Sequence, residues 1–199
     1  MGPGSASGPT SWAATTRRRA SGGRGSRRIA RRCLPPLGGD DTGPDPTKRG
    51  KRGTKRQVLT DHQGAPLSAV ISAANRNDMK VAEATLDNVV VARPRPTPRA
   101  PRHLCRDKGF DFPATRQAAQ TRGYIVHTPQ KGRKGADPPP PPPEEERHPA
   151  RRWVIERTNS WHNRFRKLRI RYEKKARNYL GLVHLACFLI VYRLRMVLG

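Results

Sequence analysis

Two carboxylates, Asp107 and Glu156, stand where a folded chain could use them in chemistry. Asp107 directly follows Arg102–Arg106, a short segment expected to be a strand, and it opens a turn that contains Gly109. Proteins of the α/β class place catalytic groups at the ends of strands. An Asp in a turn more often bonds its own backbone, so the residue type leaves both interpretations open.

Glu156 lies in a segment with helical patterning, four residues after Arg152. At this spacing the two side chains could form an exposed ion pair worth only a few tenths of a kcal/mol. Glu156 could instead share a divalent cation with Asp107, because hard cations prefer oxygen ligands. Their spacing along the chain does not show that the two carboxylates meet, and both interpretations remain open.

Basic side chains surround Glu156 and form a candidate DNA-binding set: Arg151, Arg152, Arg157, Arg164, Arg166, Lys167, Arg169 and Arg171. The whole chain has 41 Lys and Arg against 15 Asp and Glu, a formal net charge of +26. A body with this charge favours a polyanionic partner. Nucleic acid is the first candidate, and an anionic membrane surface is the second.

The cysteines and the apolar segments exclude other classes. Cys33, Cys105 and Cys187 are too scattered for a disulfide framework or a zinc site, which favours a reducing cytoplasm. The N-terminus has no apolar run of signal-peptide length. The only long apolar run, Leu180–Tyr192, is too short to cross a bilayer and predicts a buried helix without a membrane partner.

Strand and helix patterns alternate from Gly38 onward, as in an α/β protein. The expected elements are a hairpin of Thr54–Thr60 and Ala65–Ala74, a helix Met79–Val90, a strand Arg102–Arg106, a helix Thr115–Arg122, a strand Gly123–His127 and two C-terminal helices. The first C-terminal helix has an apolar face of Val154, Trp161, Phe165, Leu168 and Tyr172. The second, about Ala176–Val197, is apolar nearly all round and is therefore expected to be buried.

Two stretches have no such pattern. Residues 1–37 contain eight Arg, no acidic residue and no strand or helix periodicity, which predicts a disordered basic N-terminus. Residues 137–146 contain six consecutive prolines followed by three glutamates, which predicts an exposed polyproline spacer. The spacer would interrupt a domain that extends over residues 38–199.

The segment Arg151–Tyr172, RRWVIERTNSWHNRFRKLRIRY, resembles the C-terminal signature of DDE transposases from bacterial insertion sequences. Four upstream segments resemble the same family in the family's order: Gly38–Gly53, Thr54–Asp61, Ala73–Met79 and His103–Asp111. The resemblance covers about residues 38–136 and 147–199. It implies a ribonuclease-H-like core, a mixed sheet with flanking helices.

The same resemblance implies three carboxylates that hold two Mg²⁺ ions for phosphodiester cleavage and strand transfer. Asp107 matches the second Asp and Glu156 matches the Glu of this set. The first Asp belongs on the first strand, roughly ten residues before Gly38, and Gly25–Leu37 contains no carboxylate. These departures predict an incomplete core, a truncated or frameshifted N-terminus outside the family, and a catalytically inactive copy with at most weak Mg²⁺ binding.

The expected function is therefore DNA transposition by descent, with double-stranded DNA at insertion-sequence ends as the partner. An oligomer on DNA and a place on the nucleoid in the bacterial cytoplasm agree with this function. The alternative is a non-enzymatic basic nucleic-acid-binding protein, in which charge alone provides the affinity. Metal dependence separates the two, because electrostatic binding needs no Mg²⁺ and cleavage does.

Overall fold

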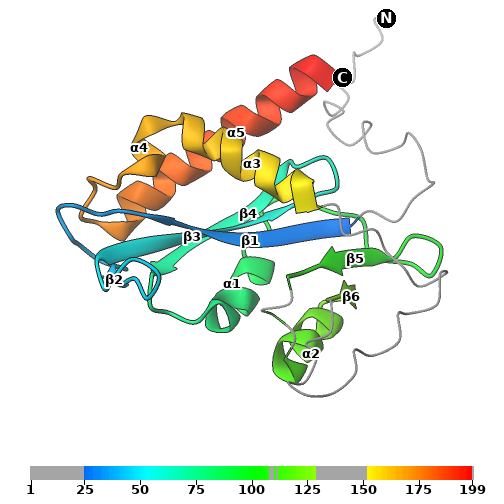
Figure 1. The fold of residues 1–199 in the computed structure, drawn as a ribbon. Helices are drawn as coiled ribbons and strands as arrows, with labels where there is room; N and C mark the ends of the chain where they lie inside the picture. Colours follow the sequence, from blue (N-terminus) through cyan, green and yellow to red (C-terminus); the bar gives the residue numbers. More distant parts are fainter. Residues whose placement is uncertain (1–24, 108–109, 111, 129–151, 199) are drawn as a thin grey trace, which may run out of the picture.

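The computed structural model describes residues 25–107, 110, 112–128 and 152–198, and it contains a mixed sheet with helices on both faces (Figure 1). The strands are β1 Gly25–Cys33, β2 Gly43–Pro44, β3 Arg52–Thr60, β4 Pro66–Ala73, β5 Arg102–Cys105 and β6 Tyr124–His127. The helices are the 3₁₀-helix η2 Asp78–Val81, then α1 Ala82–Asp87, α2 Pro113–Thr121, α3 Arg152–Arg164, α4 Arg166–Arg169 and α5 Ala176–Leu198.

The first strand of the chain lies in the middle of the sheet. The strand order is β2-β3-β1-β5-β6, and β4 pairs with β3 as well. Strand β3 is antiparallel to β1 and to β4, whereas β1, β5 and β6 run parallel. The neighbours of β1 therefore come from two separate parts of the chain, and a structure of this kind cannot be read from local pattern alone.

The expectation of disorder over residues 1–37 is wrong for the part from Gly25 onward. Strand β1 pairs with β3 from Arg27 opposite Thr60 to Cys33 opposite Thr54, and it pairs with β5 on its other edge. Pairing on both edges stabilises a strand whose Arg-rich sequence shows no apolar alternation. The expectation that the sheet lacks its first strand is wrong for the same reason. Residues 1–24 lie outside the described residues.

The segment after β1 is also part of the fold, because it packs on the C-terminal region. The backbone N–H of Arg171 donates to the carbonyl of Leu34 at 2.9 Å, and that of Asp40 donates to the carbonyl of Lys174 at 3.0 Å. Gly39 has φ of +114°, and a Cβ there would lie 2.2 Å from the same Lys174 oxygen. Only glycine fits this close approach of two backbone segments.

Each face of the sheet has its own apolar core. Val58 and Leu59 are neighbours on β3 and point to opposite faces, as alternation along a strand requires. The core under α4 and α5 contains Cys33, Val58, Ala69, Leu168, Tyr179, Val183 and Ala186. The core under α1 and α2 contains Leu59, Leu67, Leu86, Leu104, Ala119 and Tyr124.

The elements between β3 and β6 agree with the sequence-based expectation, apart from one helix. The hairpin, the two short strands and α2 lie within a few residues of their expected positions. The helix expected over Met79–Val90 is shorter, since η2 and α1 end at Asp87. The polyproline spacer at residues 137–146 lies outside the described residues.

The first C-terminal helix differs from its expected form. It was expected to continue to Tyr172, but α3 ends at Arg164 and Phe165 has an extended backbone. Tyr172 is 55% exposed rather than part of an apolar face. The chain turns after Phe165 so that Leu168 enters the core and Ile170 forms a bridge with Leu34. The helical face that is buried in α3 consists of Val154, Ile155, Thr158, Asn159 and His162.

Helix α5 begins and ends where expected, but only one of its faces is buried. Tyr179, Val183, Ala186 and Ile190 are buried against the sheet, whereas Leu185, Phe188, Tyr192 and Met196 are exposed. Over Ala176–Met196 its length and mean hydropathy of 1.4 would suffice to cross a membrane, so it is longer than the run Leu180–Tyr192 indicates. Its contacts with β4 show that one face of this helix covers the core.

Candidate active site

Asp107 follows the end of β5 beside the central strand. Strand β5 ends at Cys105, whose register partner on β1 is Arg27. Continuing the parallel register by two residues brings Asp107 level with position 29 of β1. The side chain of Asp107 is exposed. The structure therefore places this carboxylate at the carboxyl end of a parallel strand, as the sequence predicts.

A buried arginine holds the turn that contains Asp107. Arg106 is 6% exposed, and its Nη1 donates to the carbonyl oxygen of Thr115 at 2.8 Å. Its Nε donates to Oγ1 of Thr128 at 3.2 Å, just after β6. The Oγ1 of Thr115 in turn donates to the carbonyl of Phe110 at 2.8 Å. These bonds fix the turn between β5 and α2 against the neighbouring strand.

Glu156 lies on α3, the helix that packs against β1. Its side chain is exposed and stands next to the buried residues Val154 and Ile155. The β3–β4 turn fixes this part of the helix, since Oγ1 of Thr158 donates to the carbonyl of Gly64 at 2.7 Å. Gly64 has φ of +86°, and a Cβ there would lie 2.8 Å from Thr158 Oγ1. The close packing of this turn therefore requires glycine.

Position 29 of β1 lies on the sheet face that α3 covers. Its register partner on β3 is Val58, a residue of the core under α4 and α5. Helix α3 contacts both α4 and α5 as well as β1 (Figure 1). Position 29 is thus level with Asp107 and on the same side of the sheet as the helix that carries Glu156. A carboxylate at this position would supply the third member of the set that the resemblance implies.

No carboxylate stands there, because β1 reads GSRRIARRC with Ile at position 29. Two acidic residues of the neighbouring loops have structural roles. Oδ1 of Asp61 accepts from the backbone N–H groups of Gln63 and Ala65 at 2.9 and 2.8 Å. Asp45 accepts from Thr47 in the loop after β2. Within the described part of the chain, no three His, Cys, Asp or Glu side chains gather closely enough to hold a metal ion.

These described residues do not fit a two-ion centre. Asp107 and Glu156 are two of the three carboxylates that the resemblance implies, and β1 supplies no oxygen ligand in its sequence. Two ions held about 3.5–4 Å apart need carboxylates that bridge and flank them. Relative to the set that the resemblance implies, β1 therefore lacks one carboxylate.

The candidate DNA-binding set divides into exposed and buried members. Arg164, Arg166, Lys167 and Arg169 are exposed at the end of α3 and along α4. Arg157 is half-buried between two indole rings, with its guanidinium carbon 4.7 Å from the centre of Trp153 and 4.8 Å from that of Trp161. Its Nη2 also donates to the carbonyl of Gln63 at 2.6 Å. Arg151 lies outside the described residues, and Arg152 begins α3.

Arg171 does not belong to this set, and its assignment as a DNA contact is wrong. Its side chain is 0% exposed, and its Nη1 donates to Oγ1 of Thr54 at 2.8 Å. Its Nε and Nη2 donate to the carbonyls of Glu173 and Lys174 at 2.8 and 3.0 Å. The guanidinium therefore joins β3 to the loop before α5. Its place in a run of basic residues gave no sign of this burial.

A second buried arginine was missed by reasoning from the sequence. Arg56 on β3 is 2% exposed, and its Nη1 donates to the Leu168 carbonyl at 3.0 Å and to the Tyr179 hydroxyl at 3.2 Å. Its Nη2 donates to Oδ1 of Asn163 at 3.2 Å. A basic residue in a hairpin strand normally indicates a solvent-facing position, so the sequence carries no signal for this role.

His162 and Cys187 form a buried polar contact near Arg56, with Nε2 and Sγ 3.3 Å apart. Burial lowers the pKa of His162 to about 3, and the nearby charge of Arg56 acts in the same direction. Burial also raises the pKa of the Cys187 thiol to about 12. Both groups are therefore neutral near pH 7, so they serve packing rather than nucleophilic or acid–base chemistry.

Comparison with known proteins identifies the family of this chain. A family model described as a transposase DDE domain matches residues 14–191. The match begins before β1 and includes part of the stretch that was expected to lie outside the family.

The chain is 34% identical over 153 residues to a protein of Burkholderia cepacia assigned as the transposase for insertion sequence element IS402. That similarity covers 75% of this chain and 67% of the relative. A solved structure that resembles the chain is the piggyBac transposase in a synaptic complex with hairpin DNA, at 12% identity and a TM-score of 0.37. The similarity covers 60% of this chain and 25% of that one.

The family match extends over most of the sequence and includes both Asp107 and Glu156. The chain belongs to the transposase DDE domain family.

Proposed function

We propose that this chain is an insertion-sequence transposase that retains DNA binding and has lost catalysis. The observation that carries the proposal is the central strand β1, which lies beside β5 and level with Asp107 but has Ile at position 29. The proposed defect is therefore one missing carboxylate in an otherwise assembled sheet. A missing N-terminal strand is not needed to explain it.

The proposed core is ribonuclease-H-like. Three features support this assignment: a mixed sheet with helices on both faces, a first strand at its centre, and an acidic residue after the adjacent parallel strand. The family membership supports it as well. In that architecture Asp107, Glu156 and position 29 would converge on the face covered by α3.

The two remaining carboxylates limit the metal chemistry that we propose. When bound, the family's two Mg²⁺ ions polarise phosphoryl oxygens and clamp the attacking and leaving groups. A single Mg²⁺ keeps most of its waters and needs only one or two carboxylates. We therefore assign Asp107 and Glu156 weak binding of one ion, and no step of strand cleavage is assigned to this chain.

The proposed partner is double-stranded DNA, in the parent element its insertion-sequence ends. The net charge of +26 and the exposed Arg164, Arg166, Lys167 and Arg169 support this partner, because Lys and Arg on a surface release counterions from phosphates. An oligomer assembled on DNA, and a location on the nucleoid in the bacterial cytoplasm, complete the proposal.

A second candidate function is that of a non-enzymatic basic nucleic-acid-binding protein. The absence of any carboxylate in β1 favours it. Both candidate functions include DNA binding. They differ in the cleavage activity expected when a carboxylate is introduced at position 29 by mutation. A transposase core that lacks one ligand should regain metal-dependent cleavage, whereas a purely electrostatic binder should not.

The experiment combines binding and cleavage on supercoiled plasmid DNA. We expect the chain to retard the plasmid without Mg²⁺ and to leave it uncut with Mg²⁺ or Mn²⁺. Asp107→Asn and Glu156→Gln should cause no further loss of cleavage. Metal-dependent nicking that Glu156→Gln abolishes would show that the chain is an active enzyme.

A further inference from the structure

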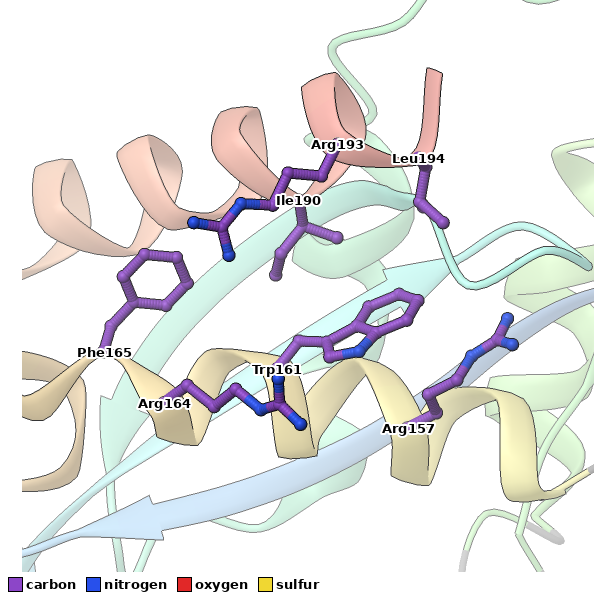
Figure 2. A pocket seen from close by; sticks show the side chains of 7 residues that line it. All are labelled: Arg157, Trp161, Arg164, Phe165, Ile190, Arg193 and Leu194. Atoms are coloured by element: carbon purple, nitrogen blue, oxygen red, sulfur yellow. The ribbon is translucent and has the colours of Figure 1, made fainter. Parts of the chain in front are cut away.

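A pocket with a volume of about 300 Å³ lies between α3 and α5, and Asp107 is not among the residues that line it. It is lined by Arg157, Trp161, Arg164, Phe165, Ile190, Arg193 and Leu194. Figure 2 shows the rings of Trp161 and Phe165 extending from the α3 side toward α5, with Ile190 extending from α5 toward them. The wall is therefore made of α3, the adjoining Phe165 and the C-terminal half of α5.

The lining combines apolar surface with positive charge. Four of the seven side chains are apolar or aromatic, three are arginines, and none is a carboxylate. Arg157 is held by its two tryptophans and by Gln63. Arg164 and Arg193 are exposed, and in the described part of the chain their guanidinium groups make no hydrogen bond or ion pair to other residues. Two guanidinium groups at the pocket are thus available to a ligand.

We propose that this pocket binds one unpaired nucleotide of DNA. The base would stack on the Trp161 and Phe165 rings, and its phosphates would bind Arg164 and Arg193. Stacking on aromatic side chains beside a basic groove is how proteins hold unpaired bases. Arginine forks match phosphate oxygens. This inference rests on the proposed DNA-binding function and names a DNA form that the basic surface alone would not distinguish.

The shape of the pocket favours an unpaired base over a duplex or a helical peptide. A base inside a duplex offers only its edges in the grooves, because its faces are covered by the neighbouring bases. A pocket of this volume is at the small end of ligand sites and suits a single ring system. A docked amphipathic helix needs a longer groove with anchors at i, i+3, i+4 and i+7.

The test measures the affinity of the full chain for three fluorescein-labelled DNAs by anisotropy. The probes are a fully paired 20-base-pair duplex, the same duplex with one bulged adenosine, and the same duplex with a bulged abasic site. We expect the adenosine bulge to bind about 5- to 100-fold more tightly than the paired duplex, as stacking of one base predicts. The abasic bulge should bind like the paired duplex.

Two kinds of variant locate the effect. Leu194→Trp fills the pocket and should abolish the preference for the bulge while leaving the affinity for paired DNA unchanged. Circular dichroism shows whether Leu194→Trp folds. Trp161→Leu removes the stacking ring and should also abolish the preference, so it tests the same contact if Leu194→Trp does not fold. The double variant Arg164→Gln with Arg193→Gln should reduce the ratio of the affinity for the adenosine bulge to the affinity for the paired duplex. The matched control changes two exposed arginines that do not line the pocket. This variant, Arg169→Gln with Arg177→Gln, should weaken the binding of all three DNAs equally.

The outcomes separate this inference from the function on which it rests. Equal affinity for all three DNAs would overturn the pocket assignment and leave DNA binding intact. A chain that binds none of them would overturn the proposed function itself. A bulge preference that survives both Leu194→Trp and Trp161→Leu would place the unpaired base elsewhere. Displacement of the bulged DNA by an acidic amphipathic peptide that binds more tightly would assign the pocket to a protein partner.

Discussion

At the scale of single residues, the resemblance proposed roles for Asp107 and Glu156 that their spacing in the sequence could not suggest. Asp107 and Glu156 are 49 positions apart in sequence numbering, and only the fold brings their elements to β1. Arg171 shows the opposite case, since its basic neighbours suggested a DNA contact and tertiary packing buried it. Burial of a charged group depends on partners such as Thr54 that local sequence does not reveal.

His162 gives the molecule a pH dependence that we can predict. Its pKa in the folded chain is about 3, below the ordinary value near 6.5, so the unfolded chain takes up the proton first. The associated stability is complete above pH 6.5 and is lost as the pH falls toward 3. Between pH 7 and pH 5 the loss should reach about 2 kcal/mol.

Urea unfolding followed by circular dichroism at pH 7, 6 and 5 measures this loss. His162→Gln carries no titrating group there and should flatten the pH dependence over the same range, although the variant starts from a lower stability. Carboxylates such as Asp87, whose pKa is lowered by its hydrogen bond from Arg122, lose their contribution only at more acidic pH. An identical pH slope in the variant would contradict the neutral buried state of His162.

At the scale of elements, the pattern of apolar residues and the turn-forming residues were sufficient to predict β3, β4, β5, β6 and α2. They were not sufficient to predict β1. The hairpin has a Gly-containing turn between two runs with strand-forming residues, and this pattern is visible in the local sequence. Strand β1 is defined by its partners on both edges, and a strand of this kind need not show alternation. The buried face of α3 contains Thr158, Asn159 and His162, so an apolar pattern could not find it.

The contact between the segment after β1 and the loop before α5 predicts a sensitive glycine. Gly39→Ala would place a Cβ 2.2 Å from the Lys174 carbonyl oxygen at φ of +114°, so the backbone must move. We expect a loss of about 2–3 kcal/mol in the free energy of unfolding. Gly50→Ala is the matched control, because φ there is +73° and nothing lies within 4 Å of its Cβ.

Gly50→Ala carries only the left-handed backbone penalty of about 1 kcal/mol. Chemical denaturation of the two variants beside the unchanged chain measures the difference. If Gly39→Ala is no more damaging than Gly50→Ala, the segment after β1 does not pack on the C-terminal region as described.

At the scale of the whole molecule, charge dominates behaviour in solution. The net charge of +26 predicts DNA affinity that falls steeply with salt, with about 0.9 in the slope of log K against log salt for each phosphate contact. Composition alone gave this expectation, since it needs no fold. The fold adds which arginines are free to contribute, because Arg56 and Arg171 are buried.

Replacing Arg164, Arg166 and Arg169 together by Ala should therefore reduce the slope by up to about 0.9 for each arginine that contacts a phosphate. Anisotropy titrations of a labelled duplex at several salt concentrations measure it. Arg122→Ala is the control, because Arg122 lies just after α2 and its Nε is paired with Asp87 at 2.6 Å. An unchanged slope in the triple variant would remove α3 and α4 from the DNA-binding surface.

We propose that one carboxylate is missing at the central strand, and position 29 allows a direct test. Ile29→Asp places an acid level with Asp107 on the face covered by α3, whereas Ala30→Asp places one on the opposite face, since side chains alternate along a strand. Ile29→Asn supplies a similar shape without the charge. Each variant is compared with the unchanged chain at equal protein concentration after circular dichroism confirms that it is folded.

The measurement is nicking of supercoiled plasmid in Mg²⁺ or Mn²⁺. We expect nicking by Ile29→Asp and none by Ala30→Asp, Ile29→Asn or the unchanged chain. Adding Glu156→Gln to Ile29→Asp should abolish the gained activity. A folded Ile29→Asp variant that binds DNA and remains as inactive as the unchanged chain would contradict the assignment of position 29. Nicking by the unchanged chain that Glu156→Gln abolishes would contradict the claim that a carboxylate is missing at all.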